Sequence, residues 1–186
     1  WLGIIANRNR ILLWMNLKTQ KDINKTLEDI SVRDSMTQFY NHEHIFRLLD
    51  QEIDYANDIK SDLSLAIFDL DDFKRINDNF GHQVGDLVLL EVAKTIKDCS
   101  RDSDLIGRYG GEEFMVIFPK LKAEQAFMVA QRIRQSIEQI NFDNFTITIS
   151  GGVVELNQNS SIELIKEADS KLMKAKKQGK NRIIYD

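Results

Sequence analysis

Apolar residues recur along the chain in two periods, one typical of amphipathic helices and the other of buried strands. The helical period occurs in residues 45–56, 88–99, 126–140 and 162–172. The strand pattern occurs in residues 63–70, 105–109, 114–118, 145–156 and 183–185. A sheet with antiparallel pairs, covered by helices, suits this order of elements, so we predict an α+β fold.

Acids and glycines mark two of the breaks in this pattern. Residues 71–80 read as a short helix with acids in its first turn, where the helix dipole favours them, and Gly81 ends it. The pair Gly151-Gly152 falls inside the predicted strand 145–156. Because glycine inside a strand pattern is typical of a local disruption of the ladder, we predict a β-bulge there.

Residues 1–33 are predicted to form a helical linker ahead of a domain that spans residues 34–186. Residues 11–30 contain no Pro or Gly, and a weak heptad runs through them with polar residues at two core positions. The heptad positions are Leu13, Leu17, Gln20, Asn24 and Leu27. Since polar core residues fix the register of short coiled coils, the pattern favours a dimerising helix. An amphipathic helix packed on its own domain is the alternative.

Composition narrows the class of protein. The chain has 186 residues, 42% of them hydrophobic and 29% charged, and its net charge is -4. That balance is typical of a globular domain, and the negative charge argues against a surface for a nucleic-acid polymer. The single cysteine, Cys99, lies on an apolar helical face. It indicates a small buried thiol in a reducing compartment, so we expect a cytoplasmic domain.

The first residues suggest a longer parent protein. The chain begins Trp-Leu-Gly-Ile-Ile-Ala, followed by Arg8 and Arg10, and no apolar run approaches the ~20 residues of a membrane span. This beginning fits the cytoplasmic end of a membrane helix with its positive flank, which would tether the full-length protein to the inner (cell) membrane. It fits the end of a soluble sensor domain equally well.

Residues 108–114 read Arg-Tyr-Gly-Gly-Glu-Glu-Phe and predict a tight hairpin with carboxylates at its tip. Gly110 and Gly111 can take the positive φ angles of a two-residue turn. The following Phe-Met-Val-Ile-Phe has the composition of a buried strand. Glu112 would then be held at a sheet edge, whereas an ordinary solvated turn is the simpler interpretation of these residues alone.

A second segment, residues 63–86, reads Leu-Ser-Leu-Ala-Ile-Phe-Asp-Leu-Asp-Asp-Phe-Lys-Arg-Ile-Asn-Asp-Asn-Phe-Gly-His-Gln-Val-Gly-Asp. Together the two segments resemble the GGDEF family, here with Glu at the third motif position. These are bacterial diguanylate cyclases, which condense two GTP into cyclic di-GMP. The resemblance runs from about Asp34 to the C-terminus. It implies a palm-like variant of the ferredoxin-like fold, GTP as substrate, a working homodimer and allosteric inhibition by the product.

Joining two triphosphates calls for a divalent metal, which neutralises phosphate charge and lowers the cost of an oxyanion nucleophile. Asp69 and Glu112 are the candidate ligands, because Mg²⁺ (or Mn²⁺) takes oxygen donors and is often bound by one or two carboxylates plus substrate phosphates. The alternative role for Asp69 is a helix N-cap. The resemblance adds the main-chain carbonyl of Leu70 as a third ligand. It also offers Glu112 as the group that assists deprotonation of the attacking 3'-hydroxyl. The role of Glu112 as this base and its role as a metal ligand are not distinguished by the sequence.

The triphosphate is expected beside these carboxylates. The backbone donors of Asp71, Asp72 and Phe73 open a predicted helix, and a helix N-terminus is a ready anion site. Lys74 adds a charge to the same phosphates. By resemblance, so do Lys176 and Lys180 in the basic tail, Lys180 standing where the family often has Arg. A solvated basic helix end is the alternative for that tail.

Two further sets of residues follow from the resemblance. Asn77 and Asp86 take the guanine-reading positions, with His82 beside them, and a carboxylate suits the N1–H and amino edge of guanine. Their alternative role is helix capping. The inhibitory product site corresponds to Arg101, Asp104 and Arg132, for which a surface ion pair is the alternative.

The chain departs from the family's usual entry motif. Gln38 replaces a glycine, Phe39 a leucine and His42 an arginine. These changes bear on the packing of the linker and leave the metal and base positions untouched. Because Asp69 and Glu112 are present, the sequence favours an active cyclase over a catalytically silent receptor for GTP or cyclic di-GMP.

Overall fold

The structure is a computed structural model that describes residue 18, residues 32–158 and residues 160–186. By its contacts the chain divides into two units, residues 1–32 and 33–186, and the sheet belongs to the second. The predicted coiled coil of residues 11–30 falls almost entirely outside the described residues, so it stays a prediction.

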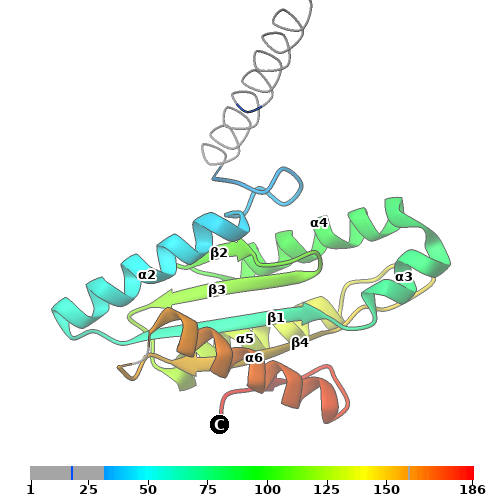
Figure 1. Cartoon of the computed structure of the whole chain (residues 1–186). Helices are drawn as coiled ribbons and strands as arrows, with labels where there is room; N and C mark the ends of the chain where they lie inside the picture. Colours follow the sequence, from blue (N-terminus) through cyan, green and yellow to red (C-terminus); the bar gives the residue numbers. More distant parts are fainter. Residues whose placement is uncertain (1–17, 19–31, 159) are drawn as a thin grey trace, which may run out of the picture. The chain divides into compact units, whose positions relative to one another are not determined.

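The second unit is built on a five-stranded sheet with the order β2-β3-β1-β4-β5 (Figure 1). The strands are β1 (Leu63–Leu70), β2 (Leu105–Arg108), β3 (Glu113–Pro119), β4 (Ile149–Glu155) and β5 (Ile183–Ile184). Neighbouring strands pair antiparallel, except that β5 runs parallel to β4. The predicted α+β fold with a mostly antiparallel sheet is confirmed.

Helices cover both faces of this sheet. They are α2 (His42–Ile59), α3 (Phe73–Phe80), α4 (His82–Cys99), α5 (Ala123–Glu138) and α6 (Ser161–Lys177). Successive side chains of a strand point to opposite faces. Leu65 and Ile67 of β1 accordingly join the apolar core under α2 and α6, whereas Ala66 and Phe68 join the core under α4 and α5. All eight residues of β1 are buried, as a central strand requires.

The predicted bulge at Gly151-Gly152 is wrong. Both glycines stay in register with β1, Gly151 opposite Phe68 and Gly152 opposite Ile67. The glycine at 152 serves a close approach instead: a Cβ there would overlap the carbonyl oxygen of Ala168 and lie 2.7 Å from the backbone nitrogen of Leu172. The missing side chain therefore lets the backbone of α6 pack directly on β4.

The ends of two elements also differ from the prediction. Strand β4 begins at Ile149 rather than at residue 145, and Phe145 instead forms an isolated bridge with Phe142. Helix α3 begins at Phe73, so Asp71 and Asp72 precede it rather than lying in its first turn. Asp72 is the N-cap residue with φ of 56° and makes no side-chain cap bond.

Gly152→Ala tests the packing of α6 on the sheet. Because the added methyl group meets backbone rather than a flexible side chain, the substitution should lower the free energy of unfolding by about 1–3 kcal/mol or more. Gly111→Ala is the matched control, since a Cβ at that position meets nothing within 4 Å. Denaturant unfolding measures both; equal transition midpoints for the two variants would contradict the close approach.

Candidate active site

The hairpin between β2 and β3 presents Glu112 at the end of the sheet. It is closed by the backbone N–H groups of Tyr109 and Gly110, which donate to the Glu113 carbonyl at 2.9 and 3.2 Å. The predicted two-residue turn is wrong: the loop comprises residues 109–112, and neither glycine has a positive φ. A Cβ on Gly110 would overlap a carboxylate oxygen of Glu113, so the Glu113 side chain packs over this glycine.

Asp69 and Glu112 meet at the junction of β1 with this hairpin. Asp69 lies directly opposite Glu113 in the β1–β3 register. The next residue, Leu70, donates its N–H to the Glu112 carbonyl at 3.2 Å. Asp69 is thus a strand residue, and its alternative role as a helix N-cap is wrong. Sequence reasoning missed Glu113, which the register of Asp69 identifies as a third acid of the site.

The three acids are partly removed from water and lie close enough to influence one another. Burial raises the pKa of Asp69, although the Lys176 ammonium opposes the shift. Burial, and then the charge of Asp69, raise the pKa values of Glu112 and Glu113. Burial therefore disfavours the charged form of all three carboxylates, and a bound cation would favour it.

Two lysines of the C-terminal segment reach the acids. The Nζ of Lys176, in the last turn of α6, lies 2.7 Å from Asp69 Oδ1. The Nζ of Lys180 lies 2.7 Å from Asp72 Oδ1. The basic tail is therefore not simply a solvated helix end. It lies against Asp69 of the predicted metal site and against Asp72 in the turn that follows.

The residues present fit a divalent metal. Asp69 Oδ1 is buried, and its one close partner among the described residues is the Lys176 ammonium. The donor set of Asp69, Glu112 and the Leu70 carbonyl consists of the hard oxygen atoms that Mg²⁺ prefers. In the described part of the chain no group of three or more His, Cys, Asp or Glu side chains is arranged to hold an ion. Substrate phosphates and water would have to complete the coordination, as they commonly do for Mg²⁺.

The turn after β1 differs from the predicted anion site. The Asp71 N–H donates to the Thr148 carbonyl at 2.9 Å, so the prediction of a phosphate donor is wrong for this residue. The buried Asp71 carboxylate accepts instead from the hydroxyls of Thr148 and Ser150, each at 2.7 Å. Phe73 is buried in the core, whereas Lys74 is exposed on α3.

The predicted base readers lie where α3 meets α4. A Cβ on Gly85 would overlap Asn77 Oδ1, so these two residues touch. His82 begins α4, and Asp86 follows one turn later; both are exposed. The N-cap residues of α3 and α4 are Asp72 and Gly81. The C-cap residues of the same helices are Gly81 and Ser100. The alternative role of Asn77 and Asp86 as helix caps is therefore wrong, and both side chains remain candidates for a ligand.

Arg101 and Asp104 bind one another. The guanidinium donates twice to Asp104 Oδ1, at 2.9 and 2.6 Å, and the Arg101 N–H donates to Oδ2 at 2.8 Å. The alternative role as an ion pair is thus confirmed: the Asp104 carboxylate is buried, whereas the Arg101 side chain is 39% exposed. Arg132 of α5 donates to the carbonyl of Cys99, which places it near the same loop. Cys99 is buried as predicted.

The entry segment is tied to the hairpin by an ion pair. Arg108 donates to both oxygens of Asp34 at 3.2 Å and to the Gly111 carbonyl at 2.7 Å. Burial alone would raise the pKa of Asp34, but hydrogen bonds from Thr37 and the charge of Arg108 hold it below its usual value. One guanidinium thus joins the start of the domain to the loop that carries Glu112.

The three departures from the family motif lie around this link. Gln38 has φ of 59°, a conformation in which glycine is unstrained. Phe39 packs edge-to-face on Phe114 with ring centroids 6.1 Å apart. His42 stacks on Tyr109, next to Gly110, at 5.6 Å.

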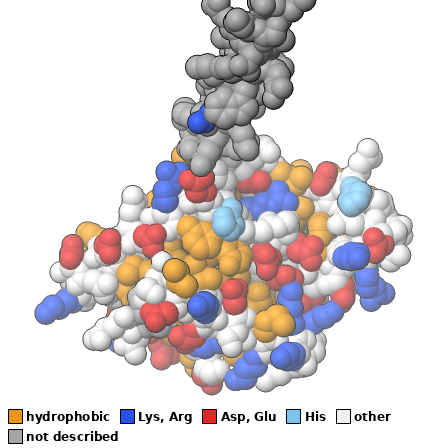
Figure 2. All heavy atoms as spheres, in the orientation of Figure 1, with side chains coloured by type: hydrophobic (Ala, Val, Ile, Leu, Met, Phe, Trp, Pro, Cys, Tyr) orange, Lys and Arg blue, Asp and Glu red, His pale blue; other side chains and the backbone are white. Residues whose placement is uncertain are grey.

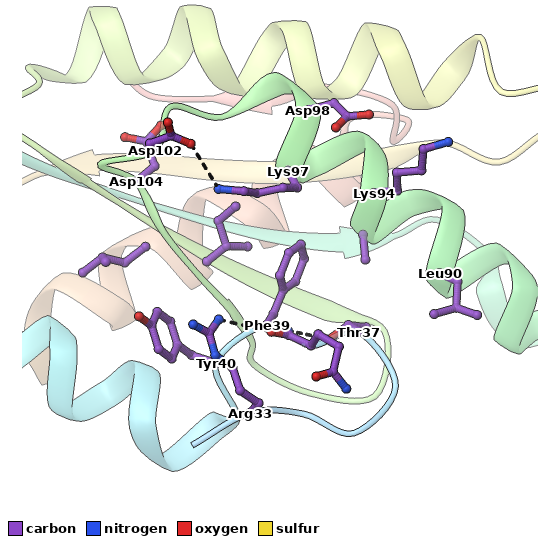
Figure 3. A pocket seen from close by; sticks show the side chains of 14 residues that line it. Arg33, Thr37, Phe39, Tyr40, Leu90, Lys94, Lys97, Asp98, Asp102 and Asp104 are labelled. Carbon is purple, nitrogen blue, oxygen red and sulfur yellow. Dashed lines mark hydrogen bonds and ion pairs between the residues drawn. The ribbon is translucent and has the colours of Figure 1, made fainter. Parts of the chain in front are cut away.

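A cavity of about 470 Å³ lies away from the catalytic candidates, between residues 33–40 and the α4 and β2 segments (Figure 3). Of the predicted site residues, only Asp104 lines it. On the face seen in Figure 2, basic and acidic side chains are interspersed, so that face has no continuous basic surface for a nucleic-acid backbone. Among the described residues, no helix combines the length and the apolar character needed to cross a bilayer.

The family model described as "Diguanylate cyclase, GGDEF domain" matches residues 31–182. The chain belongs to the GGDEF family. It is 40% identical over 169 residues to Diguanylate cyclase A of Treponema denticola, covering 86% of this chain and 46% of that protein. It is 35% identical over 185 residues to Diguanylate cyclase DgcM of Escherichia coli, covering 98% of this chain and 45% of that protein. The chain thus spans about half the length of these curated relatives.

Solved structures agree with the fold. The GGDEF domain of DgcB from Caulobacter crescentus, in complex with c-di-GMP, matches with a TM-score of 0.81 and 30% identity over 83% of this chain and 95% of that one. The active GGEEF domain of a diguanylate cyclase from Vibrio cholerae matches with a TM-score of 0.75 and 33% identity over 78% of this chain and 96% of that one.

Asp34→Asn tests the link between the entry segment and the hairpin. Loss of the charge facing Arg108 should lower stability by about 1–2 kcal/mol. Because Arg108 also holds Gly111, amide exchange in residues 109–112 should accelerate. Asp50→Asn removes the same charge from an exposed position of α2 and serves as the control. Unchanged exchange in residues 109–112 would show that Arg108 holds the hairpin without Asp34.

Proposed function

We propose that this chain is the catalytic part of a diguanylate cyclase, which joins two GTP into cyclic di-GMP and releases two pyrophosphates. The observation that carries the proposal is the junction of Asp69 with the hairpin of Glu112, with Lys176 beside it. The names of the relatives support the same activity. Intact carboxylates at both positions argue for an enzyme rather than a silent receptor.

Asp69, Glu112 and the Leu70 carbonyl would hold Mg²⁺ or Mn²⁺. When bound, the ion would neutralise triphosphate charge and stabilise the attacking oxygen. Glu112 is half-buried with a raised pKa, so it is suited to take the proton of the 3'-hydroxyl. Lys176 pairs with Asp69 and Lys180 with Asp72, and both would turn to the phosphates, with Lys74 on α3 as a further charge.

Guanine would be read at the α3–α4 junction. Asn77 can donate and accept, whereas the Asp86 carboxylate can only accept, and this set matches the N1–H and amino edge of guanine. His82 lies beside them at the start of α4. Adenine presents an acceptor at N1, so Asp86 would select against it.

The reaction requires a homodimer. Each domain provides one set of base and phosphate residues, and each 3'-hydroxyl must meet the α-phosphate held by the other copy. The heptad of residues 11–30 would raise the local concentration of the second copy. The domain would work in the cytoplasm, with the N-terminal side of the chain leading to a sensor or a membrane anchor.

Product inhibition would use Arg101, Asp104 and Arg132. Arginine can bind guanine O6 and N7 in a bidentate manner. Since Arg101 already donates to Asp104, product binding would reorganise this pair rather than meet a free guanidinium. The relative DgcB has been solved in complex with c-di-GMP, which supports a product site in the family.

Glu112→Gln tests the activity. The substitution keeps the size of the side chain but removes the charge that holds metal and takes the proton, so turnover should fall by roughly a thousandfold or more. Glu124→Gln on the exposed start of α5 is the matched control. Production of cyclic di-GMP from GTP and Mg²⁺, followed by chromatography, measures both. Near-normal formation by the Glu112 variant would refute the assignment.

Asp86→Ala tests base recognition. Loss of one charged hydrogen bond costs about 1.5–3 kcal/mol, so GTP affinity should fall roughly 10- to 100-fold while the turnover of bound substrate changes little. Asp98→Ala, at an exposed position near the other end of α4, is the control. Calorimetry measures the affinity; equal affinities in wild type and the Asp86 variant would exclude this residue as a guanine reader.

A further inference from the structure

The loop that joins α6 to β5 has an unusual backbone. Three consecutive residues have positive φ: Gly179 at 110°, Lys180 at 61° and Asn181 at 48°. Glycine takes such angles readily, whereas two adjacent residues with side chains do so only where the surroundings fix the conformation. The contacts of this loop should therefore reveal what fixes it.

Asn181 makes hydrogen bonds with its backbone N–H and with both polar atoms of its side chain. Its N–H donates to Asp71 Oδ2 at 3.0 Å, and its Nδ2 donates to Glu138 Oε1 at 2.6 Å. Its Oδ1 accepts from Arg134 Nη1 at 2.8 Å. Arg134 also donates to the other Glu138 oxygen at 2.8 Å and is 14% exposed. A closed polar cluster thus joins the loop to the end of α5.

The Asp71 end of this cluster is held by further hydrogen bonds. Its carboxylate is buried and also accepts from Thr148 and Ser150, at the start of β4. Asp71 therefore anchors Asn181 to the turn that follows β1. That turn carries Asp72, which pairs with Lys180.

We propose that Asn181 is a positioning residue that holds Lys180 in place for the triphosphate. Asn181 itself would not touch the substrate; it fixes the loop from which Lys180 extends. Asparagine suits the position because it tolerates the left-handed conformation and offers both a donor to Glu138 and an acceptor to Arg134. The inference rests on the proposed function, since it assumes a nucleoside triphosphate beside Asp69.

A double-mutant cycle separates positioning from a general effect on folding. The probe is a GTP analogue with a methylene group between its α- and β-phosphates, which blocks the reaction, and affinity is measured by calorimetry with Mg²⁺ and the whole chain. Lys180→Ala and Asn181→Ala should each weaken binding by roughly 10-fold, the effect of one charge-assisted contact. If Asn181 acts through Lys180, the double variant should be no weaker than Lys180→Ala. Independent, multiplying effects would overturn the proposal.

A reversed hydrogen bond provides a rescue test. Asn181→Asp alone brings a second carboxylate to Glu138 and should weaken binding and speed amide exchange in residues 178–182. Adding Glu138→Gln restores the hydrogen bond with its direction reversed, because the new amide at position 138 now donates to the carboxylate at position 181. The double variant should recover both the analogue affinity and the slow amide exchange. Failure to recover either would contradict the positioning role. Asn157→Ala, at an exposed loop position, is the control and should change neither.

These outcomes are distinguishable from failure of the proposed function. Suppose that wild type makes no cyclic di-GMP while the affinities of the variants for the analogue follow the predicted double-mutant cycle. In that case the cyclase assignment fails and the role of Asn181 stands. If wild type makes the product while Asn181→Ala binds the analogue normally, the positioning role fails and the cyclase assignment stands.

Discussion

The buried carboxylate of Asp69 is the constraint on which the site depends. It lies on the central strand, where burial disfavours its charge, and Glu113 is directly opposite. Two like charges ~4 Å apart repel by roughly 4 kcal/mol at an effective dielectric constant of 20. The fold offsets part of this cost with Lys176 at the end of α6, and a divalent cation would offset more. The close approach of α6 to β4 at Gly152 therefore has a direct consequence for the chemistry.

Two sets of contacts lead from this centre to distant parts of the domain. Arg108 joins the Glu112 hairpin to Asp34 at the start of the domain. On the other side, Asp71 joins the turn after β1 to Asn181 and through it to α5. The Glu138 carboxylate, at the far end of the second set, is 45% exposed. The Asp71 carboxylate, however, is buried, and the side chains of Arg108 and Asp34 are 17% and 20% exposed. Hydrogen bonds between such groups are worth more than on the surface. The segments that hold the acids and the lysines are thereby fixed from opposite ends.

The hydrophobic period predicted the longer helices, the strands and the α+β class, because it records which side of each element is buried. The short helix α3 was predicted instead from its acids and from Gly81. The period could not predict close approaches between elements. Gly152 was assigned to a bulge, whereas it is needed for space against the backbone of α6. Gly110 and Gly111 were assigned to a tight turn, whereas neither has a positive φ. Glu113 was missed because its relation to Asp69 depends on strand register. Asn181 was missed because its partners, Asp71 and Glu138, are 110 and 43 residues away in the chain.

The position of Lys180 explains why such a remote cluster matters. The family often has arginine there, whose planar fork can bind phosphate in a bidentate manner and so tolerates less precise support from the backbone. An ammonium group is a point charge on a flexible stem, and its orientation is not set by its own geometry. With lysine, the direction of the charge depends on the backbone that carries it. The left-handed loop fixed by Asn181 supplies that direction, and it brings the Lys180 ammonium to Asp72, in the turn that follows Asp69.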